Sequence, residues 1–268
     1  MLNKSATDTQ VTHLQRLWLY ALCTLVIFFL IIPTLLVIPM SFSDSRYLSF
    51  PPESWSLRWY RAYFSSAEWL QATAVSFKVA FLTMILATTT GTLASYGLHT
   101  TRARMGKYMM VLLTMPMIIP VILLAVGIFL TFAPVGLNST IAGLVLAHTV
   151  LAIPLVMITV TAGLKNFDIN QEMVARSMGA SRPWAFLTVT LPQIRNSVLS
   201  GALLAFIISL DEVVIALLIA GGDKATLTRR MFLALRDEID PTIAAISTLL
   251  IVFSVVMLAL SQFLQSKK

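Results

Sequence analysis

Six long apolar stretches, separated by shorter polar segments, dominate the pattern along the chain. A helix must contribute about 20 mainly apolar residues to cross roughly 30 Å of hydrocarbon at about 1.5 Å per residue. The stretches that meet this length are residues 17–40, 70–98, 108–132, 141–164, 197–220 and 242–264. The first is longer than the core of a signal peptide, which favours a retained span. The pattern therefore predicts an all-α polytopic membrane protein whose domain of six transmembrane helices covers residues 17–264.

The composition agrees with this pattern. Of the 268 residues, 57% are hydrophobic and only 12% are charged, whereas ordinary soluble domains have about 45–50% and about 25%. Too few charged side chains are present to cover a surface that faces water. A soluble enzyme and a disordered tail are excluded, and a single cysteine, Cys23, excludes a scaffold of internal disulfides.

The positive charges predict the orientation. Lys and Arg residues remain on the cytoplasmic side during insertion. Eleven of them fall on the side of the two termini and seven on the other side, while Lys78 lies within a span. We therefore expect both termini in the cytoplasm, with residues 1–16 as an N-terminal cytoplasmic segment and residues 265–268 as a tail. The outer loop 221–241 is expected to contain a short helix across the mouth of the bundle.

The inner loop 165–196 carries the most informative pattern. A short amphipathic helix is predicted from Asn170, its N-cap, to Met178, and Gly179 is expected to end it in the left-handed conformation. A second helix is expected from Pro183, because proline is favoured in a first helical turn. Two helices joined by a tight turn would form a stiff lever.

This loop resembles the EAA loop of the binding-protein-dependent ABC importer permeases. That pattern has Glu-Ala-Ala, three residues, Gly, nine residues, an apolar residue, any residue and Leu-Pro. Gly179, Val189 and Leu191-Pro192 stand at the matching spacings. Met173, Val174 and Ala175 replace Glu-Ala-Ala, and Glu172 lies one residue before the acid position. Glu172 or Arg176 is expected to replace the missing polar contact.

The resemblance implies a type I ABC importer permease fold in the bacterial inner membrane. It also implies partners: a second, non-identical permease, two ATPase subunits and a periplasmic substrate-binding protein. ATP and magnesium would be bound by the ATPase, with no cofactor in this chain. The residues expected to couple to the ATPase are Glu172, Met173, Ala175, Arg176, Gly179, Ala180, Arg182, Trp184, Leu191 and Pro192.

Two acids, Asp211 and Glu212, lie inside the fifth predicted span. A charged side chain near the bilayer centre is costly, so such residues mark function. They are expected to contact substrate or form a gate, together with Ser209, Phe206 and Lys78. Two alternatives are open: an ion pair of Lys78 with either acid that only satisfies the charges, and an interface with the partner permease.

The segment 203–214 resembles the spermidine and putrescine permeases, which implies a small cationic solute. A permease of the same family for another amine, an amino acid derivative or an opine is an alternative.

No phosphate-binding Gly-x-x-x-x-Gly-Lys-Ser/Thr motif is present, and we expect no catalytic activity. An ion-coupled secondary transporter also contains broken helices and buried acids, but would not need the inner loop. His148 in the fourth span is expected to be a hydrogen-bonded packing residue.

Overall fold

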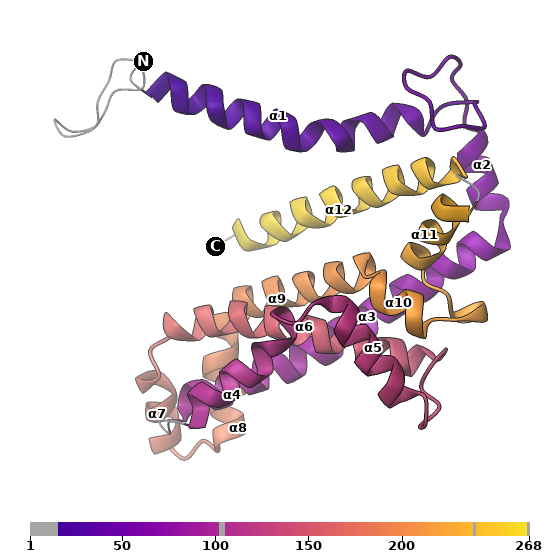
Figure 1. The fold of residues 1–268 in the computed structure, drawn as a ribbon. Coiled ribbons are helices and arrows are strands. Elements are labelled where there is room, and N and C mark those ends of the chain that lie inside the picture. The colour runs from indigo at the N-terminus through magenta and orange to yellow at the C-terminus, as the bar shows by residue number, and fades with distance from the viewer. Residues whose placement is uncertain (1–15, 102–104, 238–239, 267–268) are drawn as a thin grey trace. The chain divides into compact units, whose positions relative to one another are not determined.

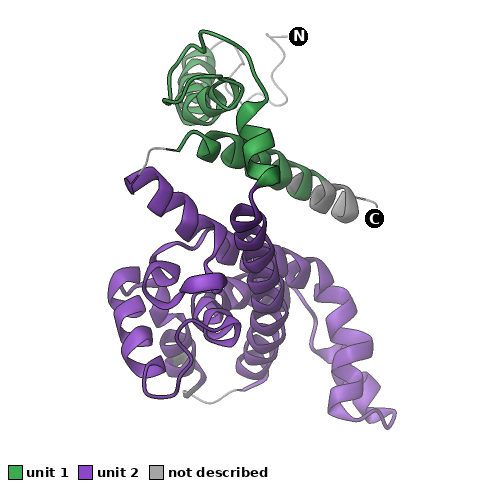
Figure 2. Cartoon of the chain, turned by 90° about the vertical axis from the view of Figure 1, so that its right-hand side faces the viewer, with its two compact units in different colours: residues 1–65, 238–259 green, residues 66–237, 260–268 purple. Residues whose placement is uncertain are grey.

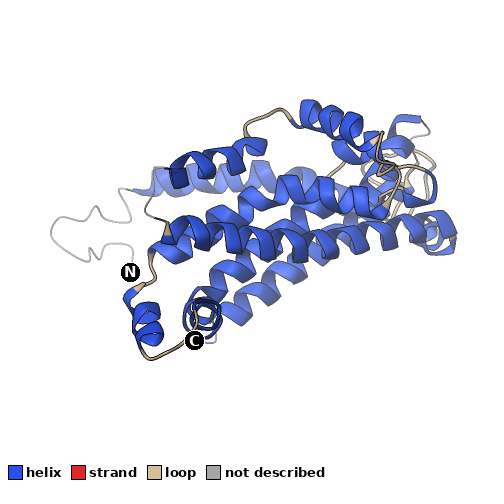
Figure 3. Ribbon diagram, turned by 90° about the horizontal axis from the view of Figure 1, so that it is seen from below, coloured by secondary structure: helices blue, strands red, loops and turns tan. Residues whose placement is uncertain are grey.

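The computed structural model describes residues 16–101, 105–237 and 240–266. The predicted segment 1–16 (except Arg16), Arg102 and Arg104 of the inner side, and the last two residues of the predicted tail lie outside the described residues. Every regular element in the described ranges is a helix (Figures 1 and 3). The helices are α1 Leu17–Met40, α2 Arg58–Ser65, α3 Ala67–Thr100, α4 Met105–Thr114, η2 Met115–Met117, α5 Val121–Phe132, α6 Ile141–Lys165, α7 Asn170–Ser177, α8 Arg182–Ala185, η3 Phe186–Thr190, α9 Leu191–Asp211, α10 Val214–Ile219, η4 Gly222–Lys224, α11 Leu227–Asp237 and α12 Thr242–Ser266.

The chain divides into two compact units (Figure 2). The smaller unit holds residues 1–65 and 238–259, with α1, α2 and most of α12. Within it, the hydroxyls of Ser41 and Tyr60 are 2.7 Å apart, and the rings of Phe42 and Tyr60 pack 5.2 Å apart. These contacts fold the segment after α1 back onto α2.

The larger unit, mainly residues 66–237, is built on a bundle of α3, α6 and α9, which pack against one another. Val156 of α6 is fully buried at the centre of this bundle. A Cβ atom on Gly91 of α3 would come 2.9 Å from the Val156 side chain, and one on Gly201 of α9 would come 3.2 Å from its Cα atom. Glycine at these two positions lets both neighbouring helices approach α6 closely, as small residues do in membrane bundles.

Short helices extend both ends of this bundle. The pair α7 and α8 lies at one end, and α10 and α11 lie at the other (Figure 1). All the residues that the sequence singles out for function fall at or between these two ends. The bundle therefore carries one candidate site at each end.

Four helical stretches are long and apolar enough to cross a membrane: α1, α3, α6 and the continuous helix Arg182–Asp211. The third predicted span, 108–132, is instead two helices that meet at 99°. Pro116 and Pro120 lie at this bend, where each lacks the N–H that a continuous helix needs. Counted together, the bent pair makes a fifth candidate, and the described apolar part of α12, Thr242–Met257, is shorter. The count of six spans and the cytoplasmic termini remain predictions.

The fifth predicted span also differs from expectation. It begins earlier than residue 197, because α8, η3 and α9 form one helix from Arg182. It ends at Asp211, and Glu212 and Val213 separate it from α10. Asp211 is therefore the last residue before a break in the helix, and Glu212 lies within the break.

Candidate functional site

The inner loop folds as two helices with a tight turn between them. Gly179 has φ +98°, the left-handed conformation that the sequence predicts for it. The N–H of Ala180 donates to the carbonyl of Ala175 over 3.1 Å, and that of Gly179 donates to Arg176 over 3.0 Å. These bonds close the end of α7 as a left-handed cap does.

The predicted start of the first helix needs a correction. Asn170 is the first residue of α7 and not its N-cap. Its N–H donates to the side-chain oxygen of Asp168 over 3.0 Å. The predicted second helix is confirmed as α8, which begins at Arg182 with Pro183 in its first turn.

Glu172 points into the protein. Its side chain is buried, with the residue 2% exposed. Tyr96 Oη donates to Glu172 Oε1 over 2.5 Å, and Thr190 Oγ1 donates to Glu172 Oε2 over 2.6 Å. The carboxylate is therefore engaged inside the chain. Of the two residues expected to replace the missing polar contact, Arg176 is the exposed one, and the contact itself stays a prediction.

Arg182 extends the same cluster. Its Nη2 donates to Thr100 Oγ1 over 2.6 Å, and its Nε donates to Tyr96 Oη over 3.4 Å. The guanidinium also lies 5.5 Å from the centre of the Tyr96 ring, which in turn packs 4.5 Å from Phe186. The first turn of α8 is thereby attached to the end of α3.

The other side of the loop is exposed. Met178 is 84% exposed and Trp184 is 62% exposed. Both line an open hollow of about 770 Å³ together with Ala175, Gly179, Ala180, Ser181 and Thr188. Large exposed apolar side chains around a hollow are typical of a protein-docking surface. Met173, which stands at the acid position of the motif, and Arg176 are also exposed.

Leu191 and Pro192 lie where the loop enters the bundle. They begin α9 directly after the π-helical segment η3. Leu191 packs against the buried core of the bundle. Pro192 has no N–H to donate, and π-helical segments are one way in which a helix accommodates such a gap.

At the other end of the bundle, Glu212 holds the start of α10. Its carboxylate accepts from the N–H of Ile215 over 2.9 Å and from that of Ala216 over 3.1 Å. His148 Nε2 lies 3.6 Å from Glu212 Oε2, and His148 Nδ1 is 2.8 Å from Ser209 Oγ. Glu212, His148 and Ser209 are all buried, so His148 is the hydrogen-bonded packing residue that the sequence predicts.

Asp211 has a different environment from its neighbour. It is exposed and lines a hollow of about 450 Å³. Glu212 and Val213 border the same hollow from the α9–α10 break, and Pro116 and Met117 border it from the α4–α5 bend. Two interrupted helices thus meet at one cavity, and Asp211 forms no ion pair there with any residue that the structure describes.

Lys78 and Phe206 complete the predicted pathway set. Lys78 is exposed, and within the described ranges it forms no ion pair, so the proposed pair with Asp211 or Glu212 is absent. Phe206 is buried, with its ring 6.1 Å from that of Phe77. The structure therefore brings Ser209, Asp211 and Glu212 together and leaves Lys78 apart from them.

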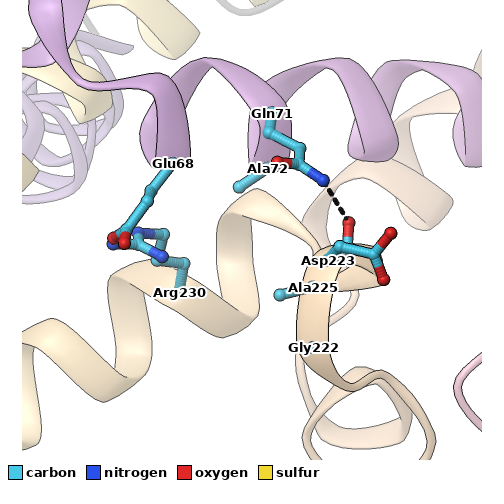
Figure 4. A pocket seen from close by; sticks show the side chains of 7 residues that line it. All are labelled: Glu68, Gln71, Ala72, Gly222, Asp223, Ala225 and Arg230. Carbon is cyan, nitrogen blue, oxygen red and sulfur yellow. Dashed lines mark hydrogen bonds and ion pairs between the residues drawn. The ribbon is translucent and has the colours of Figure 1, made fainter.

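The outer loop contains the short helix expected of it. That helix, α11, is attached to the start of α3 around a hollow of about 230 Å³ (Figure 4). Gln71 Nε2 donates to the carbonyl of Asp223 over 2.9 Å, and Arg230 forms an ion pair with Glu68. The adjacent ammonium of Lys224 lowers the pKa of the Asp223 carboxyl and pairs with its negative charge.

Three contributors to these sites were not predicted from the sequence. Tyr96 and Thr190 hold Glu172, and the hydroxyl of Thr228 donates over 2.8 Å to the carbonyl of Glu212. One signal for Glu172 exists: it lies three residues after Ile169, which packs on the buried core, and so shares its helix face.

Residues 91–268 match the family described as the binding-protein-dependent transport system inner membrane component. The chain belongs to this family. It is an ABC transporter permease of the inner membrane. The matched residues include the whole of the inner loop and both ends of the bundle.

Named relatives agree with this assignment. The chain is 32% identical to the spermidine/putrescine transport system permease protein PotC of Haemophilus influenzae, over 89% of this chain and 93% of that protein. It is 28% identical to PotC of Escherichia coli strain K12, over 90% of each. It is 27% identical to the putrescine transport system permease protein PotI of the same strain, over 87% and 85%.

A solved structure confirms the fold. A bacterial ABC transporter involved in the import of the acidic polysaccharide alginate superposes with a TM-score of 0.70. The match covers 97% of this chain and 99% of that chain at 13% identity. The chain therefore shares the helical fold of that transporter chain over almost its whole length.

Proposed function

We propose that this permease forms half of the pathway of an ATP-driven importer for a small cationic solute of the polyamine class, such as putrescine or spermidine. A second, non-identical permease would form the other half. Two ATPase subunits would bind ATP and magnesium, and one of them would dock on the exposed face of loop 170–192. A periplasmic binding protein would deliver the solute.

The observation that carries the coupling role is the two-sided geometry of that loop. Its exposed side presents Met178 and Trp184 around a hollow, which suits a partner protein. Its buried side is bonded to α3 and η3 through Glu172. A movement imposed on the exposed side would reach the spans because the loop is attached to them, whereas a secondary transporter has no need of such a loop.

The polyamine class is supported by the relatives and by Asp211. Two kinds of relative named for spermidine or putrescine transport cover most of the chain. Asp211 lines the hollow between two interrupted helices and forms no ion pair with any described residue. Interrupted helices commonly form substrate sites in transporters. A carboxylate at that place would replace part of the water around an ammonium group.

The test is the ATPase activity and uptake of the reconstituted complex with its binding protein. Putrescine, spermidine, γ-aminobutyrate and neutral amino acids are compared in wild type, Asp211→Asn and Glu212→Gln. We expect stimulation by the diamine and triamine, and an uptake about tenfold lower in Asp211→Asn, since a charge-assisted hydrogen bond contributes about 1.5–3 kcal/mol.

Two results would contradict the proposal. Stimulation by γ-aminobutyrate or a neutral amino acid, with none by polyamines, would remove the substrate class. Uptake that follows an ion gradient, with no ATPase subunit bound to the permease, would favour a secondary transporter.

A further inference from the structure

The Glu172 carboxylate is an unusual connection between elements that are distant in sequence. Its two partners, Tyr96 and Thr190, lie 76 and 18 residues away. A buried carboxylate is costly unless its oxygens are hydrogen-bonded. In the described residues no Lys, Arg or His lies within 4.0 Å of it, so the two hydroxyls satisfy this group.

These two bonds attach the first turn of α7 at two separate places. Between α7 and α3, the described residues form one hydrogen bond, from Tyr96 to Glu172. Gln193 of α9 donates to Gln171 over 2.6 Å, but that pair is exposed, and exposed pairs contribute little. Among the described residues, the buried hydrogen-bonded link from α7 to α3 therefore depends on one side chain.

The second attachment falls on the irregular part of the long helix. Thr190 is the last residue of η3, is fully buried, and lies two positions before Pro192. A π-helical segment interrupts the regular bonding ladder, and such segments often occur at functional sites. Glu172 therefore touches the point at which the helix Arg182–Asp211 departs from regular geometry.

Glu172 and its neighbour Met173 face in different directions. Met173, at the family's acid position, is 48% exposed, whereas Glu172 beside it is buried. One residue therefore faces outward and its neighbour faces the spans. In this chain the acidic residue of the loop is Glu172, one position earlier than in the motif, and its carboxylate accepts hydrogen bonds inside the protein.

We propose that Glu172 is a positioning residue that fastens α7 to the end of α3 and to η3, so that a displacement of the loop is passed to both spans together. This rests on the proposed coupling role of the loop. Tyr96 and Thr190 are the receiving groups, and Arg182 supports Tyr96 from the side of α8.

The experiment uses the full complex in proteoliposomes with Glu172→Gln, Tyr96→Phe and Thr190→Val. Tyr96→Phe and Thr190→Val remove one hydroxyl each and keep the shape of the side chain. Gln171→Ala is the matched control, because it removes an exposed bond from the neighbouring residue of the same helix. The first measurement is the number of solute molecules imported per ATP hydrolysed.

The second measurement is the distance between spin labels on Ser177→Cys of α7 and Leu93→Cys of α3, in a Cys23→Ser background, with and without ATP. Ser177 and Leu93 are exposed, and so is Cys23. We expect a narrow distance distribution in the parent and in Gln171→Ala. In the three cluster variants the distribution should broaden, and import per ATP should fall about fivefold while ATP hydrolysis continues.

A different outcome overturns the proposal. If import and hydrolysis fall in the same proportion and the distances stay narrow, Glu172 has only a structural role. The distances between the spin labels depend on the bonds of Glu172 and not on which solute is transported. Failure of the wild type to use ATP would thus count against the proposed function, and an unchanged distance distribution would count against the Glu172 assignment.

Discussion

Two buried glutamates lie at opposite ends of one helical bundle, and they are held in opposite ways. Glu172 is bonded by side-chain hydroxyls from two other elements. Glu212 is bonded by backbone N–H groups three and four residues further along its own chain. The first joins distant segments, and the second stabilises a local interruption of the helix.

The neighbours of these two glutamates differ as well. Beside Glu172, the next residue along the chain is the exposed and apolar Met173, which suits a protein partner. Beside Glu212, the exposed residue is the charged Asp211 at a hollow, which suits a cationic solute. In both regions one residue of an adjacent pair maintains the architecture and the other faces outward.

This contrast predicts the largest stability effect at Glu172. Glu172→Ala leaves the buried hydroxyls of Tyr96 and Thr190 without their partner, and each such loss costs about 1–3 kcal/mol. We expect the free energy of unfolding to fall by about 2–4 kcal/mol, measured by thermal unfolding of the purified permease in detergent. Gln171→Ala, the exposed control, should change it by less than about 0.5 kcal/mol. An equal fall in the free energy of unfolding in Glu172→Ala and Gln171→Ala would contradict the special role of Glu172.

A smaller and more local effect is expected at Glu212. Glu212→Ala removes the group that accepts from two N–H groups at the start of α10, and loss of a cap of this kind costs about 0.5–2 kcal/mol. Hydrogen exchange should accelerate at the amides of Ile215 and Ala216 and remain unchanged in α7. Asp211→Ala is the control, since its side chain makes no such bond. Faster hydrogen exchange throughout the bundle would show that Glu212 stabilises the whole bundle and not only the start of α10.

Much of the architecture could be predicted from the sequence because membrane spans obey a simple length rule. Helix α1 has the predicted bounds, and α6 begins at the predicted residue and ends one later. The left-handed turn at Gly179 also follows from local chemistry alone. The bend lies at Pro116 and Pro120, which cannot donate a backbone hydrogen bond, and α5 beyond it packs against α10.

The sites could be predicted less well, because the partners of the acids are distant or lack a local signature. The break after Asp211 has no proline or glycine to announce it. The side chain that accepts from the first turn of α10 belongs to Glu212, one residue before the N-cap Val213, and glutamate is not among the preferred capping residues. The alternative of an ion pair between Lys78 and either acid is absent from the described residues. The sequence could not exclude it, because charge and depth do not reveal which way a helix faces. Tyr96 and Thr190 were missed since nothing in their own segments points to Glu172.

The measurement that tests the central claim most directly is the number of solute molecules imported per ATP hydrolysed by the complex with Gly179→Pro. Proline fixes φ near −65°, whereas Gly179 has φ +98°, so the turn between α7 and α8 cannot form. Gly179→Asn is the matched control, because asparagine tolerates the left-handed conformation. The account predicts that ATP hydrolysis continues while import per ATP falls close to zero in Gly179→Pro, and that Gly179→Asn retains most of it. Import per ATP at the wild-type value in Gly179→Pro would contradict the coupling role of the loop.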